Sequence, residues 1–415
     1  MPTTRQTYDA VLKEYYLPKV REVLNNYVFL LTQVQHNSED IEGRRAVLAI
    51  RTGRNSGVGA RAEMGGLPSP GNQTFSEERV SLKYNYGRIL ISGPVMKSTS
   101  SDRGSFTRAL TSETEGVTND LKKDVNRQLY GTSNGVIATL AATASSNNLT
   151  LAGTPGVAQQ TALRQLQVGM VIDAGPIGAP NVLARTITAV NTATGVITFS
   201  GAAAATGAGD VVGRAGSLGT GVNQVELTGL QTQIAATGAL WNIDPATAGP
   251  GWASYVLDAA NVDPTEAMFI QCQQEVNINS GEQIDLWITD AVVHRKVANL
   301  LTSIKRFPVP LELHGGWKAL DMSSTLQGDQ GGTTVALRFE ADAPMGVAFG
   351  LCTKRLQWYK MSDWEWMQED GAVLNRTYDA TKGPLDAYEG TLFIYAEMAT
   401  DGRNAHARIN NIKIT

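Results

Sequence analysis

Residues 45–86 read RAVLAIRT (45–52), GRNSGVGARAEMGGLPSPGNQTFSEE (53–78) and RVSLKYNY (79–86). The first segment predicts an outgoing strand, and the third alternates apolar and polar residues from Val80 to Tyr86, the period of a half-buried ribbon. The middle segment holds six glycines and two prolines but almost no large apolar side chain. Because an isolated two-stranded ribbon is marginal in water, we expect this hairpin to find its partner on another subunit.

A long amphipathic helix is predicted directly after the hairpin, from Ser105 to Tyr130, with Ser101 or Asp102 as its N-cap and Gly131 as its stop. At 1.5 Å per residue it would be roughly 40 Å long. Its apolar stripe comprises Phe106, Leu110, Val117, Leu121, Val125 and Leu129. Its other face carries Glu113, Glu115, Asp120, Lys122, Lys123 and Asp124. A surface helix over a sheet is the ordinary alternative, and the position after the hairpin favours an assembly protein.

A helix–strand–helix block follows later in the chain. The residues 263–276 predict a helix opened by Asp263 and Pro264, and the apolar run IDLWITD (284–290) predicts a buried strand. The residues 291–304 predict a second helix, capped by Asp290.

The order of these elements resembles the major capsid proteins of tailed bacteriophages, which have the Hong Kong 97-type fold. Three later segments are similar in character to the closing strands of that family: LHGGWKALD (313–321), FEADAPMGVAFG (339–350) and YEGTLFIYAEMATDGRNAHARINNI (388–412). The resemblance covers most of the chain outside about 136–222, and it rests on element order because the family has no short invariant motif.

The resemblance implies an α+β chain with the Hong Kong 97-type capsid fold. Its expected parts are an N-terminal arm (1–44), an extended loop hairpin (45–92), a peripheral domain with the long helix (93–135 and 356–415) and an axial domain (223–355). Some capsids of this family link their subunits through a lysine of the extended loop. Since this loop has no lysine from Gly53 to Arg79, we do not expect that reaction here.

Charge nearly vanishes in the segment 136–222, which we interpret as an inserted small β-barrel accessory domain. Short β-rich runs such as ARTITAVN and GVITFS are separated by glycine, asparagine and threonine, with NTATG (191–195) as a hairpin connection. A low-complexity linker is the alternative, and the regular alternation in these runs argues against it. We expect the insert to lie on the outer wall or between capsomers and to be dispensable for folding of the rest.

No residue pattern predicts a catalytic, cofactor or metal site. The four histidines lack zinc-like spacing, and neither a P-loop nor a GxSxG elbow is present. The acids Asp363 and Glu365 could face Glu369 and Asp370 as paired glycosidase carboxylates, but no second acidic segment converges on them, which argues against a catalytic site there. Cys272, in a predicted helix, and Cys352, in a predicted strand, fit reduced core thiols.

Charge and composition also limit the function. The net charge of −4 and the pI near 5.7 argue against a nucleic-acid reader, so any packaged DNA would be contacted weakly and non-specifically. The N-terminus lacks the apolar segment of a signal peptide, and no apolar run approaches membrane-spanning length.

The resemblance implies a structural protein that assembles with itself into hexamers and pentamers of an icosahedral shell around double-stranded DNA. Its partners would include a scaffolding protein, a portal and possible decoration proteins, and assembly would take place in the host cytoplasm. We also expect either a separate scaffold or a chain numbered without its precursor segment. An encapsulin-type compartment shell and, more distantly, a secreted carbohydrate-binding or adhesin protein are the alternatives.

The unevenly distributed charge predicts an intersubunit contact. Arg51, Arg54 and Arg61 precede the first acid of the hairpin loop, Glu63, while the long helix exposes acids along its first half. We therefore expect these arginines to meet acids on a neighbouring copy. The candidate acids are Glu113, Glu115 and Asp120.

Overall fold

The computed structural model describes residues 28–98, 109–153, 160–304, 310–313, 317–321, 335–379, 381 and 383–415. The chain divides into two compact units. The first consists of Met1–Tyr27, Tyr86–Leu121 and Trp364–Phe393, and the second of Val28–Asn85, Lys122–Asp363 and Ile394–Thr415. Within the described ranges, no helix is long and apolar enough to cross a membrane.

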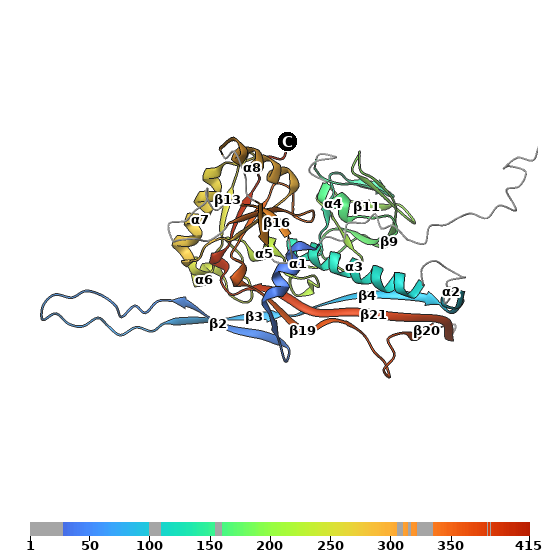
Figure 1. The fold of residues 1–415 in the computed structure, drawn as a ribbon, viewed down its shortest axis with the longest axis horizontal. Helices are drawn as coiled ribbons and strands as arrows, with labels where there is room; N and C mark the ends of the chain where they lie inside the picture. The colour runs from blue at the N-terminus through green and yellow to red at the C-terminus, as the bar shows by residue number, and fades with distance from the viewer. Residues whose placement is uncertain are drawn as a thin grey trace, which may run out of the picture. The chain divides into compact units, whose positions relative to one another are not determined.

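The predicted hairpin is present. Strand β2 (Arg45–Gly53) pairs antiparallel with β3 (Thr74–Ser81), from Arg45 opposite Ser81 to Gly53 opposite Thr74. Figure 1 shows the pair with the connecting loop at its tip. The prediction that RAVLAIRT forms the outgoing strand is therefore confirmed.

The predicted returning strand is broken at Leu82, which belongs to neither β3 nor β4 (Lys83–Ser92). Before the break the buried residues are Glu78 and Val80, whereas after it Asn85 is buried and Tyr84 and Tyr86 are exposed. The expectation that both tyrosines share the apolar face of Val80 is wrong. A shift of one residue in a strand exchanges its two faces, and β4 joins a different sheet from β3.

Strand β4 pairs with β21 in a five-stranded sheet whose remaining order is β1-β19-β21-β20. The bounds are Ser38–Asp40 for β1, Leu356–Trp366 for β19, Asn375–Asp379 for β20 and Gly383–Thr400 for β21. The short helix α2 (Gly93–Ser98) follows β4 directly.

The long helix α3 spans Ala109–Tyr130 and ends where Gly131 was predicted to stop it. Its predicted first residues and N-cap lie outside the described residues. Leu121, Val125 and Leu129 of the predicted stripe are buried. In the first unit, a Cβ added at Gly87 of β4 would lie 2.8 Å from Val117 Cγ2, so glycine is required where this strand meets the helix.

A seven-stranded sheet lies in the second unit, in the order β13-β22-β18-β14-β17-β16-β15, and its strand β22 comes from outside the predicted axial range 223–355. The pairs β13–β22 and β14–β17 are parallel, and the other pairs are antiparallel. The bounds are Tyr255–Asp258 (β13), Leu286–Thr289 (β14), Pro310–Leu313 (β15), Trp317–Asp321 (β16), Ala336–Phe339 (β17), Ala348–Leu351 (β18) and Ala407–Asn410 (β22).

Helices α7 (Glu266–Ser280) and α8 (Ala291–Ile304) lie beside this sheet in Figure 1. Phe269 of α7 packs edge-on against Trp287 of β14 at 4.8 Å between ring centroids. The buried strand was predicted correctly, and so was the cap of α8, because Asp290 Oδ1 accepts bonds from the backbone N–H groups of Val292 and Val293.

The predicted start of α7 is wrong. The helix begins at Glu266, after Thr265 in extended conformation, and neither Asp263 nor Pro264 opens it. Asp263 Oδ1 instead accepts from Nζ of Lys296, within α8, at 2.6 Å, so it is engaged by another helix rather than by the first N–H groups of α7. Cys352 is buried as expected but lies one residue beyond β18, and burial raises the pKa of both thiols, Cys272 and Cys352, to about 12.

The segment 136–222 folds around its own apolar core, which includes Leu149, Ile172, Ile197, Phe199 and Val212. Its antiparallel strands follow the order β5-β12-β8-β9-β10-β7, and β11 pairs with β6. A bridge between Leu140 and Leu151 links the chain beside β5 to the chain beside β7, the two ends of that order. The bounds are Ala138–Thr139 (β5), Ala144–Ser146 (β6), Asn148–Thr150 (β7), Val171–Gly175 (β8), Val182–Asn191 (β9), Val196–Phe199 (β10), Ala204–Thr206 (β11) and Val211–Arg214 (β12), with helix α4 at Gln160–Gln165.

Short helical turns connect these elements. They are α1 (Phe29–Val34), η2 (Gln35–Asn37), η3 (Gly221–Asn223), α5 (Leu230–Gln233), α6 (Pro245–Ala248), η4 (Pro250–Trp252), η5 (Thr353–Arg355) and η6 (Arg403–Ala405).

Candidate assembly surfaces

The loop between β2 and β3 carries apolar side chains into solvent. Val58, Met64 and Leu67 are 84%, 101% and 91% exposed. The tip is held by local bonds only: Arg61 donates to the carbonyls of Ala60 and Gly66, at 2.9 and 3.1 Å. These three side chains make the loop a candidate contact surface for another protein chain.

Arg51, Arg54 and Arg61 are exposed, and within the described part of the chain none of them forms an ion pair. The predicted acids Glu113, Glu115 and Asp120 are exposed on α3. The arginines belong to one unit and the acids to the other. Their pairing between two copies remains a prediction.

The C-terminal turns of α3 form a buried polar joint, which we call the α3 hub: Lys123, Asp124, Asn126, Arg127 and Gln128. Asp342 accepts from Lys123 Nζ at 2.8 Å and from Asn126 Nδ2 at 2.7 Å. Arg127 donates to Asp124 at 2.9 Å and to Glu226 at 2.5 Å.

The α3 hub also holds segments from three other parts of its unit. Asn126 Oδ1 accepts from the N–H of Leu31 in α1, and Gln128 Nε2 donates to Asn85 in β4. Arg214 of the insert binds Asp124 at 2.7 Å. One helix end therefore fixes the chain leaving the arm, the hairpin and the insert.

Charge compensation keeps the α3 hub ionised despite its burial. Burial alone would raise the pKa of Asp124, but Arg127 and Arg214 outweigh it and hold that pKa well below its ordinary value. Burial alone would lower the pKa of Arg127, but the negative charges of Asp124 and Glu226 outweigh it and raise that pKa above its ordinary value. Removing one charge would leave the others buried without compensation.

Sequence reasoning missed the α3 hub. It placed Lys123 and Asp124 on the exposed face of the helix, whereas Asp124 is largely buried and Asn126, Arg127 and Gln128 are fully so. The available signal was the two polar triplets Lys122–Asp124 and Asn126–Gln128, which fill the positions between the buried Leu121, Val125 and Leu129. Such a pattern indicates bonding to several segments at once rather than a solvated face.

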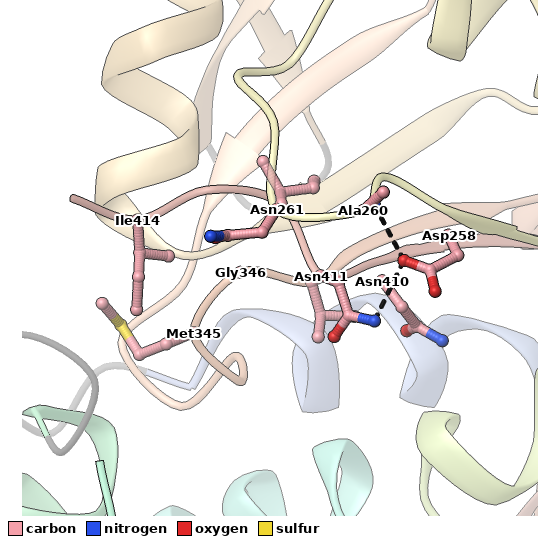
Figure 2. Close-up of a pocket in the computed structure, with 10 residues that line it drawn as sticks. Asp258, Ala260, Asn261, Met345, Gly346, Asn410, Asn411 and Ile414 are labelled. Atoms are coloured by element: carbon pink, nitrogen blue, oxygen red, sulfur yellow. Dashed lines mark hydrogen bonds between the residues drawn. The ribbon is translucent and has the colours of Figure 1, made fainter. Parts of the chain in front are cut away.

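A pocket of about 490 Å³ lies at the carboxyl ends of β13 and β22 (Figure 2). Asp258 Oδ1 accepts from the N–H of Ala260 at 2.8 Å and from Asn411 Nδ2 at 3.0 Å, and these bonds lower the pKa of Asp258. Met345 and Ile414 line the opposite end. The pocket gathers a single carboxylate, so it lacks the acid and base pair of a hydrolytic site.

The acids at 363–370 do not form a paired carboxylate site. Asp363 pairs with Lys360 at 3.2 Å, and Glu365, Glu369 and Asp370 are exposed. In the ranges described, no three His, Cys, Asp or Glu side chains gather as metal ligands would.

Comparison with known proteins gives structural matches over the whole chain. The chain from the cyanophage A-1(L) capsid asymmetric unit matches with a TM-score of 0.60 at 11% identity, covering 99% of each chain. Lower scores of 0.48 are found for the SrpI encapsulin of Synechococcus elongatus (8% identity, 100% and 97% covered) and for Mycobacterium phage Bobi (10% identity, 99% of each chain). No family model and no curated protein matches the sequence.

The cyanophage match takes in the hairpin, the long helix and the central sheet in one full-length alignment. At 11% identity it bears on the fold, not on any residue of the surfaces described above. The described part of the chain thus has an α+β fold of the Hong Kong 97 type.

Proposed function

We propose that this protein is a structural shell subunit, the major capsid protein of a tailed bacteriophage. The observation that carries the proposal is the likeness to a phage capsid chain over 99% of both chains. The exposed hairpin with its apolar tip supports it, because such a ribbon is stable only when another surface covers it. In this role the protein has no reaction to catalyse.

Hexamers and pentamers of this subunit would close an icosahedral shell around double-stranded DNA. The subunit would work with a scaffolding protein, a portal and possible decoration proteins, and would assemble in the host cytoplasm. The acidic net charge of −4 fits a wall that touches packaged DNA weakly. Quasi-equivalent contacts require adaptable interfaces, and the glycine-rich hairpin loop supplies one.

We also propose that the insert 136–222 is a small β-barrel. The bridge between Leu140 and Leu151 joins the two ends of its strand order, which supports closure of the sheet. Closure of the sheet removes the open edge strands through which sheets aggregate. A domain on the outer wall of a shell would need this protection, because its surface faces solvent.

Electron microscopy of the purified protein tests the shell proposal. Concentrated protein, alone and with a coexpressed scaffold candidate, is expected to form closed icosahedral particles. Particles that form around protein cargo and never around DNA would favour the encapsulin alternative. A subunit that stays monomeric under all these conditions contradicts self-assembly.

A further inference from the structure

The hairpin is joined to its unit through a small apolar cluster, which we call the hairpin root. It comprises Ile41, Ala46, Leu48, Val80, Leu82, Trp241, Tyr359 and Ala399. Glu78 points the same way as Val80 along β3, lies opposite Leu48, and is 1% exposed. An acidic side chain is thus buried where an exposed ribbon meets a packed core.

Neither carboxyl oxygen of Glu78 has a hydrogen-bond partner among the described residues, and the indole Nε1 of Trp241 is also buried without one. A buried carboxylate without compensation is strongly unfavourable, whereas the neutral acid is tolerated. The groups around Glu78 therefore favour its protonated form.

The charges facing the hairpin root have the wrong sign to hold a carboxylate. Asp401 lies close enough to Glu78 to disfavour its ionisation. Burial, together with the charges of Glu39, Glu78 and Asp401, raises the pKa of the Tyr359 hydroxyl. The cation Arg355 is already engaged by Asp401 at 3.1 Å and by Glu282 at 2.7 Å. Burial first, and Asp401 second, raise the pKa of Glu78 to about 8.

A tight turn holds the hairpin root from the other side. Leu240 and Ile243 exchange two backbone bonds of 2.9 Å, and Trp241 and Asn242 between them have φ of 50° and 73°. The carbonyl of Trp241 accepts from the N–H of Arg79 at 3.0 Å. This turn therefore ties β3 to the rest of its unit immediately beside Glu78.

We propose that Glu78 is a protonation latch: its neutral form packs the hairpin against the hairpin root, and its ionisation releases the hairpin to pivot. The release requires no ligand, since the carboxylate gains water when β3 leaves the cluster. The latch sets how freely the ribbon can reorient, and it does not depend on the proposed shell function.

The direction of the pH dependence follows from the two states of Glu78. In the released state the carboxyl has its ordinary pKa of 4.5, and in the packed state about 8. The packed state is thus most favoured below about pH 4.5 and becomes less favoured as the pH rises. Above about pH 8 it loses no further stability from this group. Between these values the opening constant should rise about tenfold per pH unit, because one proton is released on opening.

Hydrogen exchange on the full-length unassembled protein measures this opening. Protection of peptides covering residues 75–82, corrected for the chemical exchange rate, is compared from pH 6 to pH 9. We expect opening to increase roughly 50-fold from pH 6 to 8 and then to level off. The buried strand 286–289 serves as the internal reference for any global loosening.

Variants assign the effect to one carboxyl. Glu78→Gln should make opening independent of pH, while Glu77→Gln, at the exposed neighbour that pairs with Arg79, should keep the wild-type slope. Asp401→Asn keeps Glu78 but removes a charge that raises its pKa, so opening should level off at a lower pH. This second variant tests the latch if Glu78→Gln does not fold. A wild-type profile without pH dependence, or an equal slope in Glu78→Gln, overturns the latch.

Discussion

The C-terminal turns of α3 bury charged side chains beside apolar ones. Arg127 is buried between the carboxylates of Asp124 and Glu226, and Asp124 also pairs with Arg214 of the insert. Desolvation of such groups offsets most of their attraction, so a buried network specifies one arrangement more than it adds stability. Here the arrangement specified is the meeting of α3 with three other segments.

Breaking the α3 hub should destabilise the subunit strongly. Arg127→Leu is expected to lower the free energy of unfolding by about 3–5 kcal/mol, because Asp124 and Glu226 would stay buried without their cation. Chemical denaturation of the unassembled subunit measures the loss. Arg88→Leu is the matched control: Arg88 pairs with Glu389 but is 67% exposed, so its loss should be below about 1 kcal/mol. Equal losses in both variants would contradict the role of burial.

Buried carboxyls should also make stability depend on pH. Glu397 is fully buried, and burial raises its pKa to about 8 although the N–H of Thr228 bonds to it. The folded state therefore holds a proton that the unfolded state loses near 4.5, and stability should fall by about 1.4 kcal/mol per pH unit up to about 8. Unfolding free energies at pH 6, 7 and 8 should show a shallower decline in Glu397→Gln than in wild type. An unchanged decline would mean that Glu397 is ionised in the folded subunit.

At the scale of elements, local signals were predicted well and long-range contacts were not. The strand at 45–52, the helix end at Gly131 and the Asp290 cap depend on neighbours within a few residues, so the sequence pattern suffices. The break at Leu82 arises because β3 and β4 enter different sheets, and the true start of α7 reflects the pairing of Asp263 with Lys296. Neither partner is near in sequence, so periodicity could not reveal them.

The candidate surfaces divide in the same way. The exposure of the hairpin arginines followed from composition and the lack of nearby acids. The α3 hub, Glu78 and the turn at Trp241 each depend on residues more than fifty positions away, which no single-sequence pattern brings together.

The insert offers a test of element independence. Its two ends lie together, since the N–H of Gly219 donates to the carbonyl of Asn134 at 3.2 Å, so a short Gly/Ser bridge can replace 136–222. We expect a soluble, folded subunit whose melting temperature is slightly lower, because the half-exposed Arg214 no longer pairs with Asp124. Circular dichroism and thermal melting check this. Aggregation of every such deletion would show that the insert is needed for folding.

The hairpin loop should differ between free and assembled protein. Its tip is exposed and held by local bonds, so limited proteolysis is expected to cut the free subunit between Gly57 and Gly66. The same bonds should be spared in assembled particles, where a neighbour covers them. Equal resistance in the two states would mean that the loop is not an interface.

At the scale of the whole molecule, weak contacts gain importance through repetition. A single exposed ion pair contributes only about 0–1 kcal/mol. A closed assembly repeats each contact in every subunit, so a small free-energy contribution per contact can decide whether assembly proceeds. The exposed arginines of the hairpin and the exposed acids of α3 are the surfaces on which such a contribution would act.

Charge reversal at Arg54 tests this contact. Arg54→Glu should reduce the yield of assembled particles and weaken the dependence of assembly on salt, while the melting temperature of the free subunit stays unchanged because Arg54 is exposed. Reversal of the matching acid, Glu113, Glu115 or Asp120 to Lys, should restore part of the yield only in the Arg54→Glu background. Arg295→Glu, on the exposed side of α8, makes the same change in net charge and controls for non-specific repulsion. If both arginine variants assemble like wild type, the hairpin charge is solvated and the shell is held by other contacts.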